Sequence, residues 1–234
     1  MSRQRNILIT GTSRGLGKEQ AEHFLNMGDH VYGCARTEGQ IDHPNYFHYQ
    51  LDITSAEAVS EFFFSLRKQI KQLDALINNA GIASMNAFAL TPVESLQKTF
   101  NVNFQGTFLF CQKALGLLKR APHPRIINMT TVAVPLQLEG EAIYAASKSA
   151  VETLTRILAK EYGRFGITCN AIGPSPIDTA LIKGVPKEKI AQLVNQQAIK
   201  KMSTPADVIN LTDFFLLPES KMISGQVIYL GGIS

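Results

Sequence analysis

The sequence predicts an α/β fold, a single three-layer domain with a doubly wound parallel sheet of about seven strands and helices on both faces. Short β-rich runs bounded by turn residues alternate with longer segments of helical period along the chain. A glycine-rich turn stands directly between the first of these runs and the first helical segment. The chain has 234 residues, 45% of them hydrophobic and 18% charged. That length and composition indicate one globular domain over residues 1–234.

In the first half, strands are expected at residues 6–10, 30–35, 46–51 and 73–77. A helix over residues 15–27 should end at Gly28. The segment Thr54-Ser55-Ala56-Glu57 is typical of a capping box, and Phe62, Phe63, Leu66 and Ile70 give the helix that it opens an apolar face.

In the second half, Thr91-Pro92-Val93-Glu94 predicts another capping box, opening one long helix that runs to residue 118. Strands are expected at 125–129, 168–172 and 226–230, with helices over 144–162 and after Thr204-Pro205-Ala206-Asp207. The least regular stretch, 173–189, is rich in Pro, Gly and Ser. We expect a substrate lid around residues 173–200.

Bulk features exclude several classes of function. The net charge of +4 comes from Lys and Arg spread along the chain, so no nucleic-acid or membrane partner is expected. Cys34, Cys111 and Cys169 form no CxxC pair, and the five histidines show no ligand spacing, so no disulfide framework or metal site is expected. Because no segment looks like a signal peptide or a membrane span, we expect a cytoplasmic protein.

The glycine-rich turn Thr10-Gly11-Thr12-Ser13-Arg14-Gly15-Leu16-Gly17 predicts a dinucleotide site of the Rossmann type. Its glycines permit unusual dihedrals and a close approach of pyrophosphate to the N–H groups that open the helix. The alternative is an ordinary tight turn. Expected cofactor contacts in this turn are Gly11, Ser13, Arg14, Gly15, Leu16 and Gly17.

The end of the second strand predicts the choice of cofactor. It reads Gly33-Cys34-Ala35-Arg36, without the carboxylate that would bond the ribose 2′-OH of NAD. Arg36, with Arg14 from the glycine turn, predicts a clamp on the 2′-phosphate of NADP. The alternative is that both arginines are surface charges.

Tyr144 and Lys148 are four residues apart in a helical segment, so they share one face. A nearby ammonium favours phenolate and would lower the tyrosine pKa toward a value useful for proton transfer. Taken alone, the pair also fits a surface tyrosine and a solvated lysine.

Over nearly the whole chain, these motifs resemble the short-chain dehydrogenase/reductase family. Thr10 to Gly17 is similar to the family's TGxxxGxG, and Asn78-Asn79-Ala80-Gly81 to its NNAG segment. The Tyr-x-x-x-Lys pair is also a family feature. Further matches in the family's order are Asp52 with Ile53, Asn103, and Asn170-Ala171-Ile172-Gly173-Pro174.

The resemblance implies a role for each matching residue. Tyr144 protonates the nascent alkoxide, Lys148 lowers the pKa of Tyr144 and holds the nicotinamide ribose, and Asn103 anchors a water in the proton path. Asp52 and Ile53 meet the adenine. The remaining implied cofactor contacts are Asn79, Ala80, Gly81, Pro174, Ile177 and Thr179, with Thr179 on the nicotinamide carboxamide.

Two positions depart from the family pattern. Thr131 stands where the family usually has the serine that polarises the substrate carbonyl. Threonine keeps the hydroxyl but adds a methyl group, and Thr130 is a neighbouring candidate. Ser175 follows Pro174 where the family commonly has glycine.

The expected function is NADP(H)-dependent reduction of a ketone or 3-oxoacyl-type carbonyl to a secondary alcohol, by a homotetramer or homodimer. The resemblance is nearest to 3-oxoacyl-[acyl-carrier-protein] reductases, so the substrate could be carried as an acyl chain. Alternatives are a catalytically silent NADP(H)-sensing protein and a dehydrogenase of a sugar, polyol or secondary metabolite. The six-residue Tyr–Lys spacing of enoyl reductases is absent from the sequence, which disfavours reduction of a carbon–carbon double bond.

Overall fold

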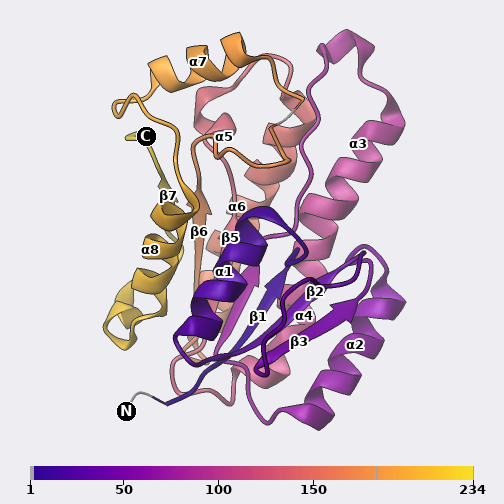
Figure 1. Cartoon of the computed structure of the whole chain (residues 1–234), viewed down its shortest axis with the longest axis vertical. Coiled ribbons are helices and arrows are strands. Elements are labelled where there is room, and N and C mark those ends of the chain that lie inside the picture. Colours follow the sequence, from indigo (N-terminus) through magenta and orange to yellow (C-terminus); the bar gives the residue numbers. More distant parts are fainter. Residues whose placement is uncertain (1–2, 183, 234) are drawn as a thin grey trace.

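A seven-stranded sheet forms the centre of the molecule in the computed structural model, which describes residues 3–182 and 184–233 (Figure 1). The strand order is β3-β2-β1-β4-β5-β6-β7, and every pairing in the described chain is parallel. The predicted sheet is therefore confirmed. Its strands are β1 (Asn6–Thr10), β2 (His30–Ala35), β3 (Tyr46–Gln50), β4 (Ala75–Asn78), β5 (Arg125–Met129), β6 (Thr168–Gly173) and β7 (Val227–Tyr229).

Helices cover both faces of the sheet. Successive residues of a strand point to opposite faces, so in β1 Leu8 enters one apolar core while Ile7 and Ile9 enter the other. The Leu8 core packs against α2 (Ala56–Gln69), α4 (Gly106–Leu118) and α6 (Ala142–Gly163), and the other packs against α1 (Gly15–Asn26) and α8 (Pro205–Leu216). This is the predicted three-layer, doubly wound arrangement.

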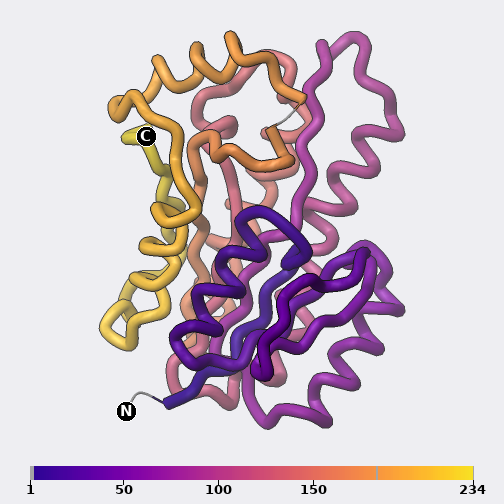
Figure 2. Tube along the Cα trace, viewed as in Figure 1, coloured from indigo at the N-terminus to yellow at the C-terminus, as the bar shows by residue number. Residues whose placement is uncertain are grey.

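The strand order reverses between β1 and β4, which pair from Ile7 with Ala75 to Ile9 with Ile77. In such sheets ligands bind in the crevice outside the carboxyl ends of the strands at this reversal. The trace in Figure 2 shows the segment from β6 through α7 (Lys187–Gln196) passing over this end of the molecule. The predicted irregular stretch thus runs into a helix at Lys187, and Lys183 lies outside the described residues.

Both predicted capping boxes are wrong. At α2 the cap is Ser55, whose hydroxyl accepts from Ala58 N, because the Thr54 hydroxyl is bonded to Asp52. At α3 (Val93–Phe100) no side chain caps the helix, because the Thr91 hydroxyl donates to Ala87 O instead. The predicted cap at the start of α8 is confirmed, and there Thr204 and Asp207 do form a capping box.

The expected long helix to residue 118 is divided. A π-helical turn, Asn101–Gln105, separates α3 from α4, and Asn103 lies buried in it. Such turns add one residue to the helical repeat and are frequent at functional sites. Short elements that the sequence did not predict are α5 (Ala133–Leu136) and the 3₁₀ turns Phe88–Leu90 and Pro218–Met222.

Candidate active site

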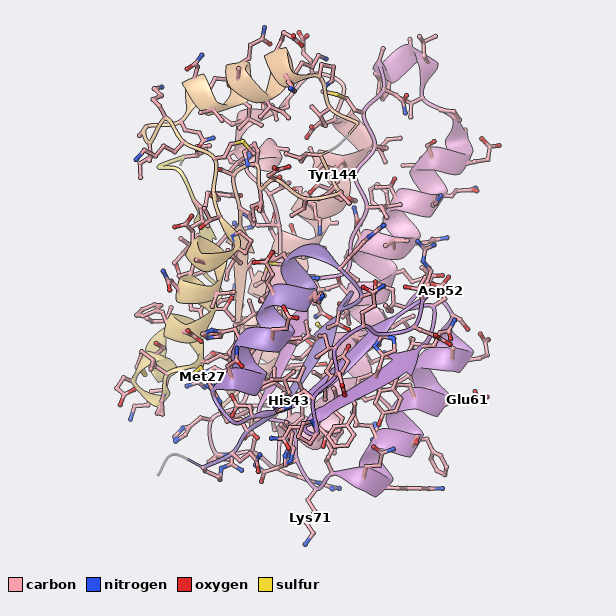
Figure 3. The ribbon with its side chains drawn as sticks, viewed as in Figure 1. Met27, His43, Asp52, Glu61, Lys71 and Tyr144 are labelled. Atoms are coloured by element: carbon pink, nitrogen blue, oxygen red, sulfur yellow. The ribbon has the colours of Figure 1, made fainter. Side chains whose placement is uncertain are left out.

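The candidate site lies where the parallel strands end. In Figure 3, Tyr144 and Asp52 lie toward this end, whereas Met27, His43 and Lys71, which precede strands β2, β3 and β4, lie toward the opposite one. Helix ends and loops that follow the strands therefore supply the predicted residues.

The glycine turn has the geometry of a phosphate cradle. Gly11 and Gly15 have φ of +78° and +57°, a region that side chains rarely adopt. At Gly17 a Cβ atom would lie 2.3 Å from the Gly11 carbonyl oxygen, so no side chain fits. No side chain caps the start of α1, and its first turn carries no acidic residue. The opening N–H groups of α1 therefore fit the pyrophosphate of a dinucleotide.

Thr10 ties the glycine turn to the segment after β4. Its hydroxyl accepts hydrogen bonds from Asn79 N and Ala80 N, each at 3.0 Å, and the Asn79 amide donates back to Thr10 O at 3.0 Å. The sequence analysis did not assign Thr10 a role. A Cβ on Gly81 would lie 3.3 Å from Lys148 Nζ, so this segment reaches the predicted catalytic lysine.

Asn103 is fully buried, and both the oxygen and the nitrogen of its side-chain amide form hydrogen bonds. Its Oδ1 accepts from Ile82 N, and its Nδ2 donates to Ile82 O and to Ser147 Oγ, all at 2.9 Å. The Ser147 hydroxyl in turn donates to the backbone oxygen of Tyr144 at 2.8 Å. Ser147, which the sequence analysis missed, therefore connects Asn103 to the Tyr144 turn of α6.

The Tyr144 phenol is buried, with 8% of its surface exposed. Burial raises its pKa to about 12, a hydrogen bond with the Thr131 hydroxyl opposes the rise, and the Glu141 carboxylate adds to it. The predicted lowering of the Tyr144 pKa is therefore not found in this structure, where the Lys148 ammonium donates to Met129 O at 2.9 Å. Burial lowers the pKa of Lys148 itself to about 8.

The two candidate threonines are distinguished by their partners. The Thr130 hydroxyl donates to Glu152 Oε1 at 2.6 Å, and Tyr229 Oη donates to the same oxygen at 2.6 Å. Thr131 is the threonine that meets the Tyr144 phenol. Only Thr131 is therefore placed to share a substrate oxygen with Tyr144.

The residues expected around the adenosine lie on the rim of the crevice. Arg14, Arg36 and Asp52 are exposed, and within residues 3–182 and 184–233 neither arginine forms an ion pair. Asp52 Oδ1 accepts from the N–H and hydroxyl of Thr54. Ile53 is buried against α4, where Gly106 makes room for it, so its side chain is a packing group.

The segment after β6 borders the same crevice. A Cβ on Gly15 would lie 3.8 Å from Thr179, so Thr179 lies beside the glycine turn. Pro174 O accepts from Val132 N at 3.3 Å, which holds the segment against the Thr131 loop. Ile177 is buried in the core with α1 and α8. Ser175 is buried too and accepts from Ser203 N at 3.0 Å, which accounts for a polar side chain where the family commonly has glycine.

A cavity of about 370 Å³ lies between the loop before α6 and the expected lid. It reaches α6 at Glu141, three residues before Tyr144. Eight of its lining residues lie between Pro176 and Gln196, and a lid role for that segment stays a prediction. Its lining is Met85, Leu136, Gln137, Leu138, Glu139, Glu141, Pro176, Ile182, Val185, Lys189, Ile190, Gln192, Leu193 and Gln196.

Comparison with known proteins identifies the family. A family model described as enoyl-(acyl carrier protein) reductase matches residues 11–233. The 3-oxoacyl-[acyl-carrier-protein] reductase MabA of Mycobacterium bovis is 30% identical, over 97% of this chain and 92% of that protein. The chain belongs to the short-chain dehydrogenase/reductase family. The predicted family resemblance is confirmed.

Other members of the short-chain dehydrogenase/reductase family are similar over the same length. The (2S)-[(R)-hydroxy(phenyl)methyl]succinyl-CoA dehydrogenase subunit BbsD of Thauera aromatica is 30% identical, over 97% of this chain and 95% of that protein. A short-chain dehydrogenase of Leptospira borgpetersenii, solved with bound NAD⁺, superposes with a TM-score of 0.89 at 26% identity, covering 98% and 92% of the two chains.

No helix in the described parts of this short-chain dehydrogenase/reductase is both long and apolar enough to cross a membrane. Among the same residues, no group of three or more His, Cys, Asp or Glu side chains is placed to hold a metal ion.

Proposed function

We propose that the protein is an NADPH-dependent reductase that converts a ketone or 3-oxoacyl-type carbonyl into a secondary alcohol. The observation that carries this proposal is that buried Thr131 is a hydrogen-bonding neighbour of the Tyr144 phenol, on the helix that also carries buried Lys148. A hydroxyl donor pair of this kind suits a carbonyl oxygen that becomes an alkoxide.

A bound nicotinamide cofactor supplies the hydride, and the chain's own residues manage position and protons. Thr131 and Tyr144 donate hydrogen bonds to the carbonyl oxygen. With a pKa of about 12, the phenol is protonated at neutral pH and gives its proton to the stronger base that forms, the alkoxide. Lys148 would hold the ribose hydroxyls of the cofactor and return a proton to the Tyr144 phenolate. Asn103 would anchor the water that connects Lys148 to solvent.

The protonated state of Tyr144 favours reduction over oxidation at neutral pH. Alcohol oxidation would need the phenolate as a base, and burial together with Glu141 disfavours that charge. The family model's description names an enoyl reductase. We nevertheless propose a carbonyl substrate, because the Tyr–Lys spacing here is four residues and Thr131 provides the second donor that a carbonyl oxygen needs.

NADPH is the proposed cofactor because exposed Arg36 follows β2 and no carboxylate ends that strand. The structure of a family relative was solved with NAD⁺, so the choice between NADPH and NADH has to be measured. We also propose a cytoplasmic homotetramer or homodimer. Exposed apolar side chains on α3 and α8 support the assembly, and three buried free thiols suit a reducing compartment.

The test is a turnover screen of 3-oxoacyl thioesters, cyclic ketones and keto-sugars with NADPH. The measured quantity is the rate of NADPH consumption. Reduction of at least one carbonyl class, lost in Tyr144→Phe, is the expected result. Tight NADPH binding without turnover of any ketone would overturn the proposal and favour the cofactor-sensing alternative. Turnover of an enoyl thioester alone would favour double-bond reduction.

A further inference from the structure

Two successive backbone carbonyls after β2 are held by side chains of the edge strand β3. Arg36 O accepts from Gln50 Nε2 at 2.9 Å. Thr37 O accepts from His48 Nε2, also at 2.9 Å. In the sheet order β3 lies on the side of β2 away from β1, whereas the glycine turn follows β1. Both carbonyls are therefore turned toward β3 and away from the glycine turn.

The same two peptides leave their N–H groups for a ligand. A peptide group is planar and trans, so its N–H points opposite to its carbonyl. The N–H groups of Thr37 and Glu38 therefore point away from β3, and within residues 3–182 and 184–233 neither forms a hydrogen bond. Arg36, Thr37 and Glu38 are exposed. The segment thus offers an anion a guanidinium, a hydroxyl and two N–H donors, and the exposed Glu38 carboxylate opposes it only weakly.

The His48 ring is also fixed through its second nitrogen. Its Nδ1 lies 2.9 Å from Tyr46 Oη, which lies 2.8 Å from the hydroxyl of the fully buried Thr12. A carbonyl oxygen only accepts, so Nε2 carries a proton and Nδ1 of the neutral ring accepts from Tyr46. Burial raises the pKa of Tyr46, which keeps that proton on the phenol. At Gly33 a Cβ atom would lie 2.5 Å from Thr12 Oγ1, so only glycine leaves room for these contacts.

The chain of contacts from Thr12 through Tyr46 to His48 connects two parts of the expected cofactor site. Thr12 belongs to the glycine turn, and His48 holds the segment that follows β2. That segment passes directly against the ring, because a Cβ atom on Gly39 would lie 2.6 Å from His48 Nδ1. The imidazole therefore fixes the segment at a set distance from the turn that cradles pyrophosphate.

We propose that His48 is a positioning residue for the 2′-phosphate of NADP(H), holding segment 36–39 with its donors arranged for the phosphate before the cofactor binds. The assignment rests on the cofactor choice in the proposed function and adds to it a residue that acts through Thr37. Ordering a binding segment in advance removes an entropic cost from association. NAD(H) has a neutral hydroxyl in place of this phosphate and gains little from the ordered donors.

The experiment measures the dissociation constants of NADP⁺ and NAD⁺ by isothermal titration calorimetry at fixed pH and ionic strength. His48→Leu removes both ring nitrogens. It should weaken NADP⁺ binding by about threefold to tenfold, the size of one hydrogen bond, with NAD⁺ binding changed by less than about twofold. His48→Gln should restore most of the NADP⁺ affinity, because the amide nitrogen can replace the ring Nε2 as donor to Thr37 O.

His43→Leu is the matched control. His43 is half-buried like His48, but its Nδ1 accepts from Asn45 N at 3.1 Å, and it lies toward the opposite end of the molecule (Figure 3). The same substitution there should leave the ratio of the two dissociation constants unchanged. Equal losses of NADP⁺ affinity in His48→Leu and His48→Gln would overturn the assignment, because the hydrogen bond to Thr37 O would then not be the cause. Matching melting temperatures show that the variants are folded.

Failure of the proposed function gives a different result. Calorimetry needs no ketone, so His48 can be tested even if no carbonyl compound is reduced. Equal affinities of the unmodified protein for NADP⁺ and NAD⁺ would reject the proposed cofactor, and the role of His48 with it. A preference for NADP⁺ that Arg36→Ser lowers and His48→Leu leaves unchanged would reject the role of His48 alone.

Discussion

At Tyr144, the phenol oxygen is the atom on which the proposed proton transfer depends. Tyr144→Phe removes it and keeps the buried ring, so kcat for carbonyl reduction should fall by about 10²–10⁴-fold, with little change in NADPH affinity. Tyr162→Phe is a suitable control, because Tyr162 lies on the same helix and its hydroxyl donates a long hydrogen bond, 3.4 Å, to Cys111 O. Near-normal turnover by Tyr144→Phe would contradict the mechanism.

Lys148 gives the reduction a pH dependence. Its pKa is lowered to about 8, so the ammonium is present below pH 8 and is lost as pH rises through that value. Reductase kcat/KM should therefore fall above about pH 8, while Tyr144, with a pKa of about 12, stays protonated. Stopped-flow rates from pH 6 to 10 check this, and Lys148→Arg should move the fall to higher pH, because guanidinium keeps its proton. A flat profile would show that the ammonium is not required.

Arg36 carries the predicted choice between cofactors. Arg36→Ser should lower the ratio of kcat/KM for NADPH to that for NADH by about tenfold, the low end for a charge-assisted contact at an exposed site. The comparison should be made at fixed ionic strength, because salt screens this contact. If Arg36→Ser leaves the ratio unchanged, the guanidinium points to solvent and another group binds the 2′-phosphate.

The sequence allowed the site residues to be named but not their electrostatic states. Tyr144 and Lys148 were expected to interact directly, yet each has its pKa shifted chiefly by burial, which depends on packing from other elements. The partner that distinguishes Thr130 from Thr131 is Glu152, twenty-one residues after Thr131.

Among the helices, two Thr-Pro starts offer a matched comparison. Thr204 caps α8 reciprocally with Asp207, whereas Thr91 makes no cap at α3. Thr204→Ala should cost about 0.5–2 kcal/mol of unfolding free energy, a fall of roughly 2–4 °C in Tm per kcal/mol. Thr91→Ala should cost less, and calorimetry on both variants checks the difference. Equal losses would mean that the box adds nothing to α8.

The same two starts show how far local patterns predict helix boundaries. Both read Thr-Pro with an acidic residue at the third position after the threonine. The outcome differs because the backbone before α3 forms a 3₁₀ turn that offers Ala87 O to Thr91. The π-helical turn was equally hidden, because Asn103 is held by Ile82 and Ser147 from other segments. The number of strands and their parallel, doubly wound arrangement were predictable, since alternating strand and helix segments allow few arrangements.

For the whole molecule, we expect association into a homotetramer or homodimer. Phe88, Leu90, Val93 and Leu96 are exposed along one stretch that ends in α3, and Phe214, Leu217 and Met222 are exposed around the end of α8. Two separate apolar regions suit two symmetric interfaces. Light scattering at micromolar concentration checks the mass, and Leu90→Glu with Val93→Glu should reduce it. A monomeric unmodified protein would contradict this prediction.

The all-parallel sheet also has a consequence for synthesis on the ribosome. β1 emerges well before its second neighbour, β4, which begins at Ala75. At about 5–20 residues per second, one edge of β1 waits roughly 3–13 seconds for its partner. During that interval Ile7, Leu8 and Ile9 form an apolar strand with open hydrogen-bonding groups, which is the kind of segment that chaperones shield and that aggregates when they are scarce. Expression at lower temperature or with extra chaperone should therefore raise the yield of soluble protein. The gain should exceed the one expected from the change in stability of the folded protein alone.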